Sequence, residues 1–168
     1  MGDPWPRVAV SMRSPDEEKC MLCELSDIEI DALLRAERVG RIGCHAGGIT
    51  YIVPVGYAYD GDSIVTLSPE GMKLRMMREN PRVCFEVEHI EHWTNWRTVI
   101  AWGNFEELTG NAAQDARKLL HATSTPLMEL ELKLRASEPG QASGTAGAEL
   151  VVCRIKLDER TGRCERLQ

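Results

Sequence analysis

Hydrophobic positions recur at helical spacing near the start of the chain. Ser26 and Glu29 form a capping-box pattern, in which each side chain can bind the backbone N–H of the other residue. Apolar residues at 30, 33 and 34 follow at the spacing of one helix face. The pattern predicts a helix with Ser26 as its N-cap, and Gly40 is the expected stop.

Residues 49–59 alternate between two kinds of side chain, which predicts a long strand. The odd positions are aromatic or branched, and they include Val53 and Val55. Most even positions are compact, and they include Pro54. We expect the odd positions to face a barrel interior. The even positions form a low face that suits a flat partner, either another subunit or a planar ligand lying close to the backbone.

Turn signals divide the rest of the chain into short elements. Asp60-Gly61 is a strong hairpin signal, and Ser68 with Pro69 and Glu70 has the composition of a helix start, which predicts a helix to Glu79. Other expected elements are strands at 41–45, 63–67, 82–88, 96–108 (bent at Gly103), 149–157 and 163–167, turns at 46–48 and 161–162, a loop at 89–95, and a helix from 111 to about 135 broken at Pro126. This order predicts a mainly β fold with peripheral helices, built as an antiparallel barrel.

Length and charge narrow the classes of function. The 168 residues fit one domain, expected at 22–168 behind a flexible arm at 1–21 and with a mobile loop at 137–148. A net charge of −6 argues against a nucleic-acid partner. The chain has no apolar run long enough for a membrane span, and its start has no signal-peptide pattern. We therefore expect a cytoplasmic protein whose six cysteines are reduced thiols.

The segment from Ser68 to Lys73 is the best candidate site. A helix start offers free N–H groups to an anion, Ser68 adds a hydroxyl and Lys73 adds a cation. The alternative is a well-capped surface helix with a solvated lysine. Cys20 and Cys23 have the spacing of metal ligands, but two further ligands have no matching spacing, so no metal is expected. No residue has the sequence context of a catalytic nucleophile.

Several short segments occur in an order and spacing typical of one family. They are VGRIG (39–43), YIVPV (51–55), DGD (60–62), GMKL (71–74), NPRVCF (80–85), WRTV (96–99) with Gly103, and TGR (161–163). Together they resemble the FMN-binding split-barrel proteins related to pyridoxamine 5'-phosphate oxidase, nearest to the nitroimidazole-resistance-type branch.

The resemblance implies an antiparallel split β-barrel and a homodimer with flavin mononucleotide (FMN) at the subunit interface. It implies that backbone groups at 53–55 lie along the flavin ring, that Ser68 and Lys73 hold the phosphate, and that Thr98 touches the flavin. Leu67 stands where many relatives have a histidine. The cofactor contacts implied in this way are Val53, Pro54, Val55, Leu67, Ser68, Lys73, Trp96, Arg97, Thr98 and Val99.

Two functions stay open at this point. The first is a flavin-dependent oxidoreductase that takes electrons from a reduced nicotinamide to a small acceptor, such as a nitroaromatic or a quinone. The second is a non-catalytic module that binds haem, a deazaflavin or a flavin for storage or redox sensing. Pyridoxamine phosphate oxidase activity itself is not expected, because residues 151–166 lack the C-terminal tryptophan and the Arg–His segment of those oxidases.

Overall fold

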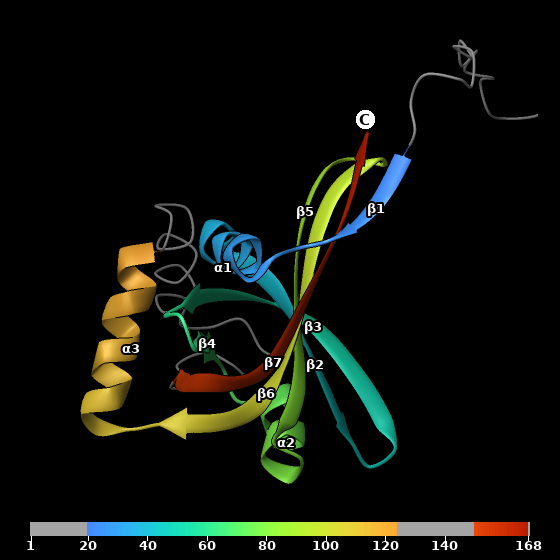
Figure 1. Cartoon of the computed structure of the whole chain (residues 1–168). Helices are drawn as coiled ribbons and strands as arrows, with labels where there is room; N and C mark the ends of the chain where they lie inside the picture. Colours follow the sequence, from blue (N-terminus) through green and yellow to red (C-terminus); the bar gives the residue numbers. More distant parts are fainter. Residues whose placement is uncertain (1–19, 124–149, 168) are drawn as a thin grey trace, which may run out of the picture.

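The structure is a computed structural model that describes residues 20–123 and 150–167. Strands make up most of this part of the chain, and helices lie at its margins (Figure 1). The elements in order are β1 (Cys20–Glu24), α1 (Asp27–Ala36), β2 (Val39–Ala46), β3 (Ile49–Tyr59), β4 (Ser63–Ser68), α2 (Met72–Glu79), β5 (Arg82–His92), β6 (Asn95–Leu108), α3 (Gly110–Thr123) and β7 (Val151–Leu167).

The strands form one antiparallel sheet that closes on itself. Their order is β1-β7-β4-β3-β2-β5-β6, and a further pairing of β6 with β7 closes the ring. β1 stands outside this ring because it is added to the second half of β7. Both long strands, β6 and β7, therefore belong to the ring and to an extension beyond it (Figure 1). The predicted antiparallel split barrel is confirmed.

The alternation along β3 separates the core from the outer surface as predicted. Val55, Tyr57 and Tyr59 are buried, whereas Ile52 is 64% exposed and Pro54 is exposed. Side chains of α1 and of the other strands fill the ring, and several are fully enclosed: Leu34, Ile42, Phe85, Val87, Val99 and Ile155. The ring can bury a core of this size because strand side chains alternate between its two faces.

α1 covers one end of the ring, and its start is the predicted one. Ser26 is the N-cap, and the capping box with Glu29 is complete. The Tyr57 hydroxyl donates to the Leu34 carbonyl at 2.9 Å, which fixes the helix on the barrel. The expected stop at Gly40 is wrong, since α1 ends at Ala36 and Gly40 lies within β2. A Cβ there would meet the Phe85 ring at 2.4 Å, so close packing explains the glycine.

The predicted start of the second helix is also wrong, although its end at Glu79 is confirmed. Ser68 is the last residue of β4, where it pairs with Val151 of β7. α2 begins four residues later, with Gly71 as its N-cap. Strand pairing therefore prevails over the local helix-start signal of Ser68-Pro69-Glu70.

The C-terminal strand runs without the turn predicted at 161–162. β7 is continuous, and Gly162 is buried beneath α1. A Cβ on Gly162 would come within 2.7 Å of Leu25 Cβ and 2.8 Å of Ile30 Cγ1. The glycine therefore permits the approach of helix to strand. Gly103, where a bend was predicted, lies at a register shift in the ladder between β6 and β7.

Other predicted element boundaries differ from the observed ones by a few residues. The loop expected at 89–95 is shorter, because β5 continues to His92 and β6 begins at Asn95. β1 was not predicted, and it takes in the last two residues of the expected arm at 1–21. The break at Pro126 and the loop at 137–148 lie outside the described residues. None of the described helices is long and apolar enough to cross a membrane.

Candidate functional site

Lys73 lies in the first turn of α2 in an unusual environment. Its side chain is half-buried, and no residue of the described part of the chain forms a hydrogen bond or an ion pair with its ammonium group. Burial lowers the pKa of Lys73, and the thiols of Cys153 and Cys44 nearby oppose this shift. A half-buried ammonium group without a counter-ion is costly, so this position favours an anion.

The start of α2 adds backbone donors to this cation. No side chain caps the helix at Gly71, and the first intrahelical bond is from the N–H of Arg75 to the Gly71 carbonyl. The Glu70 carboxylate turns away from the helix start to bind Arg78 at 2.9 Å. The first-turn N–H groups of a helix have no intrahelical acceptor and attract negative charge. Lys73 and this helix start together form a candidate site for an anion.

Ser68 and Leu67 lie on opposite faces of β4. Ser68 is buried at the end of the strand, and its hydroxyl donates to the Pro69 carbonyl at 3.1 Å. Leu67 packs in a second apolar cluster with Leu119 and Leu120 of α3. The structure thus places Ser68 beside the loop that leads to Lys73, and Leu67 beneath α3.

One edge of β3 is open. β2 pairs with all of β3 from Ile49 to Gly56 on one side, but β4 pairs with β3 only at Tyr57–Tyr59. Within residues 20–123 and 150–167, no strand covers the other edge at Val53, Pro54 and Val55. Unpaired backbone groups at such an edge are available to hydrogen-bond a ligand.

The outer face next to this edge is hollowed. A shallow hollow of about 320 Å³ lies between Ile52 of β3, Gly43 of β2, Cys84 of β5 and Trp102 of β6. Gly43 pairs with Ile52 on one side and with Cys84 on the other, so its missing side chain forms the floor. The low face was predicted from the sequence, but this hollow was not. The signal was a glycine inside a strand.

The second group of expected contacts lies elsewhere on the sheet. Trp96, Arg97, Thr98 and Val99 are on β6, which is separated from β3 by β2 and β5. Trp96 donates from Nε1 to Glu165 at 2.6 Å, and Val99 is in the core. The Thr98 hydroxyl donates to the Val87 carbonyl at 3.2 Å. One chain therefore does not bring the two groups of expected cofactor contacts together.

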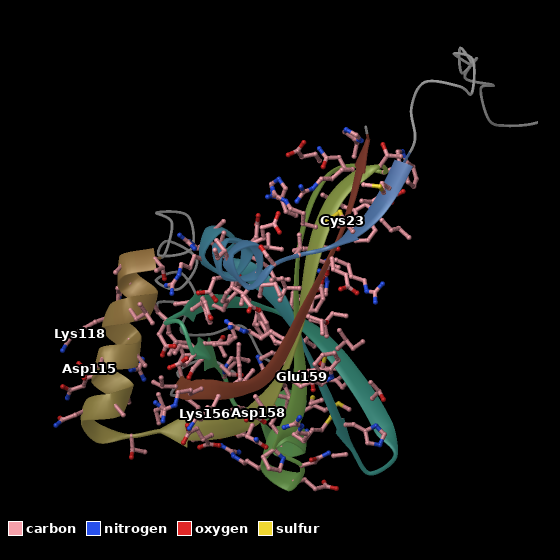
Figure 2. The ribbon with its side chains drawn as sticks, viewed as in Figure 1. Cys23, Asp115, Lys118, Lys156, Asp158 and Glu159 are labelled. Carbon is pink, nitrogen blue, oxygen red and sulfur yellow. A yellow bond between two sulfur atoms is a disulfide. The ribbon has the colours of Figure 1, made fainter. Side chains whose placement is uncertain are left out.

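One pair of cysteines is not in the predicted reduced state. Cys23 and Cys164 form a disulfide between β1 and β7, which corrects the expectation of reduced thiols throughout (Figure 2). Cys23 is thereby unavailable as a metal ligand. In the described ranges, no group of three or more histidine, cysteine or acidic side chains is arranged to hold a metal ion. Burial raises the pKa of the Cys44 and Cys84 thiols, so neither is activated as a nucleophile.

Three histidines of the described part of the chain contact neighbouring side chains. His45 Nδ1 lies 3.0 Å from the Thr50 hydroxyl, and His89 Nδ1 lies 2.8 Å from a Glu37 carboxylate oxygen. His92 Nδ1 lies 3.2 Å from the Thr94 hydroxyl. His45 lies on β2, and His89 and His92 both lie on β5.

Known proteins match this fold over nearly its whole length. An FAD-binding protein of Mesorhizobium loti is 30% identical, with 86% of this chain and 98% of that protein covered at a TM-score of 0.66. A candidate 5-nitroimidazole antibiotic resistance protein of Bacteroides thetaiotaomicron has the same TM-score at 17% identity, covering 89% and 90% of the two chains. An uncharacterised protein of Rhizobium meliloti is 30% identical over 145 residues, which are 83% of this chain and 92% of that protein.

The family comparison covers the whole ring of strands. Residues 26–164 match the family described as pyridoxamine 5'-phosphate oxidase. This range begins at the α1 cap and ends at Cys164, so it includes the anion site, the open edge of β3 and the β6 segment. The chain belongs to the pyridoxamine 5'-phosphate oxidase family.

Proposed function

We propose that this protein binds FMN as a homodimer and uses it as a flavin-dependent oxidoreductase. The observation that carries the proposal is the half-buried ammonium group of Lys73, which has no counter-ion among the described residues and lies at an uncapped helix start. A terminal phosphate dianion fits both features, because it accepts hydrogen bonds from backbone N–H groups and pairs with a cation.

The open edge of β3 fits the rest of a flavin. The uncovered backbone edge at 53–55 offers donors and acceptors to the polar rim of a ring system. Val55 points into the core, so its contribution would come from the backbone, whereas Pro54 presents a compact side chain on the outer face. A flat ligand can approach such a face closely because no long side chain stands in its way.

The separation of the two groups of contacts supports a dimer. The open edge of β3 faces away from β2, and the segment from Trp96 to Val99 lies on β6, which is separated from β3 by β2 and β5. A site that uses both groups needs β6 from a second copy. We infer that each flavin lies between two subunits, as the family resemblance implies.

The choice of FMN over FAD rests on the size of the anion site. Lys73 and one helix start suit a single terminal phosphate, whereas the diphosphate of FAD continues to an adenosine that needs further contacts. The Mesorhizobium loti relative is named as an FAD-binding protein, so both nucleotides belong in the test. Riboflavin, which has no phosphate, measures the contribution of the ring alone.

The proposed reaction moves electrons from a reduced nicotinamide to a nitroaromatic or quinone acceptor. When bound, the flavin supplies the hydride-transfer chemistry. The chain holds the phosphate with Lys73, positions the ring against β3 and excludes water with the apolar outer face. Burial raises the pKa of the Cys153 thiol to about 12, so this neighbour of Lys73 stays neutral and does not compete for the anion site.

The absorption spectrum of the purified protein tests the cofactor, and a turnover assay tests the activity. We expect flavin bands, bleaching of those bands by a reduced nicotinamide without oxygen, and their return when a quinone or nitroaromatic is added. If a reduced nicotinamide does not bleach the flavin bands, the proposed oxidoreductase activity is refuted and the protein is a flavin-binding module. A haem band without flavin absorbance would refute the proposal and support the second function.

A further inference from the structure

The disulfide between Cys23 and Cys164 joins β1 to the far half of β7. The two cysteines are direct partners in the strand ladder, with Cα atoms 5.0 Å apart, and 141 positions separate them in sequence. Cys164 is 1% exposed and Cys23 is half-buried. Figure 2 shows Cys23 on β1, which lies away from the helix labelled α2 in Figure 1.

β1 has few other attachments. It lies at the end of the strand order and pairs with β7 alone among the described strands. Its apolar side chains contribute little to the core, since Met21 is 44% exposed and Leu22 is 69% exposed. Glu24 and Arg163 are exposed and lie 3.9 Å apart, which makes a weak ion pair. Apart from the backbone ladder with β7, the disulfide is therefore the main tether of this strand.

The ring itself does not depend on β1. It closes through β6 and β7, and its enclosed side chains come from α1, α2 and the strands β2 to β7. A domain of this length buries enough apolar surface to fold without a staple. Opening the disulfide can therefore release β1 while the barrel stays folded.

The segment of β7 that β1 covers also pairs with the proposed flavin-contacting segment of β6. Arg97 is the β6 partner of Cys164, and Thr98 is the partner of Arg163. Cys23 and Glu24 are the β1 partners of these same two β7 residues. The strand that positions Thr98 is thus held on its other edge by β1.

We propose that Cys23 and Cys164 form a redox latch. Its state sets how firmly β1 is held on β7 and, through β7, how firmly the proposed flavin-contacting segment of β6 is held. A dithiol reductant opens the latch. Its two S–H bonds break and its own S–S bond forms, the Cys23–Cys164 bond accepts the two electrons, and each cysteine sulfur takes one proton. The effect on flavin rests on the proposed function, whereas the release of β1 does not.

Hydrogen exchange of the full chain tests the latch itself. The oxidised protein is compared with protein reduced by dithiothreitol and alkylated, and mapping of the alkylated cysteines verifies each state. We expect the amides of residues 21–24 to exchange at least about tenfold faster after reduction, while those of β2 and β3 change less than about twofold. Cys23→Ser should behave as permanently reduced, and Cys84→Ser should respond to reduction like the wild type. Unchanged protection of residues 21–24, or equal loss in β1, β2 and β3, would overturn the latch.

Flavin titration of the same two states tests the coupling. We expect the Kd for FMN to rise roughly fivefold on opening of the latch, and reductant to have no further effect on Cys23→Ser. An equal Kd in both states would overturn the coupling to the flavin. If neither state binds flavin, the proposed function fails, and the exchange rates of residues 21–24 still decide whether the latch exists.

Discussion

Lys73 combines half-burial with the lack of any counter-ion in the described part of the chain. Loss of a charged hydrogen-bond partner costs about 1.5–3 kcal/mol, so Lys73→Ala should raise the Kd for FMN roughly 10- to 100-fold. Calorimetric titration measures this. Arg75→Ala makes the same charge change at an exposed neighbour and should have less than about a threefold effect. Riboflavin affinity should not change in either variant. Equal losses for FMN and riboflavin in Lys73→Ala would contradict a phosphate contact.

Glu29 shows how one carboxylate can link pH to the stability of α1. The hydrogen bond from the Ser26 backbone N–H, followed by contacts with Arg166 and the Ser26 hydroxyl, lowers the pKa of Glu29 to about 2 from 4.5. A lowered pKa means that the stabilisation is present above the ordinary pKa and is lost as the pH falls toward 2. The Tm of Glu29→Gln should therefore fall less than the Tm of the wild type when the pH is lowered from about 5 to about 3.

The control for this prediction is the capping partner. Ser26→Ala removes the hydroxyl contact of Glu29 and keeps the backbone N–H contact that lowers its pKa most, and it should cost about 1 kcal/mol at neutral pH. Because the two residues share one capping box, the double variant should be less destabilised than the sum of the single changes. Identical pH dependence of Tm in Glu29→Gln and the wild type would contradict the lowered pKa.

At the scale of elements, the close approach of α1 to β7 at Gly162 gives a further test. An added Cβ would overlap Leu25 and Ile30, and overpacking of this kind costs about 1–3 kcal/mol. Gly162→Ala should therefore lower the free energy of unfolding by that amount in urea. Gly43→Ala is the control, because its Cβ would make contacts no shorter than 3.7 Å, and its effect should stay within about 0.5 kcal/mol. An unchanged free energy of unfolding in Gly162→Ala would contradict this close packing of α1 against β7.

The elements that the sequence predicted well are those in which local and long-range preferences agree. The capping box of α1 and the alternation of β3 were read correctly because nothing in the fold competes with them. Ser68 and Gly162 were misread as helix start and turn. In both, pairing with a distant strand or packing against a distant helix decides the conformation, and single-sequence patterns do not contain that information.

The candidate site was predictable in part for the same reason. The anion site is local, because Lys73 and the start of α2 are close in sequence. The hollow over Gly43 was missed because it takes side chains from four strands. The disulfide was missed because Cys23 and Cys164 are brought together only by the edge pairing of β1 with β7.

At the scale of the whole molecule, the proposed dimer predicts complementation between two defective chains. Lys73→Ala damages the anion half of the site, and Thr98→Arg blocks the β6 half. Each variant alone should bind little FMN. An equal mixture, unfolded and refolded together, should regain about a quarter of the wild-type sites, because half of the dimers are mixed and each has one intact site. Retained Tm in both variants shows that they fold. No recovery would contradict a site shared between subunits.

The most direct test of the account is the titration of FMN into flavin-free wild-type protein, with stoichiometry and oligomeric mass measured on the same sample. We predict saturable binding of one FMN per chain and a mass twice the 18.8 kDa of one chain. Absence of FMN uptake by correctly folded protein would contradict the central claim that Lys73 and the open edge of β3 form a flavin site.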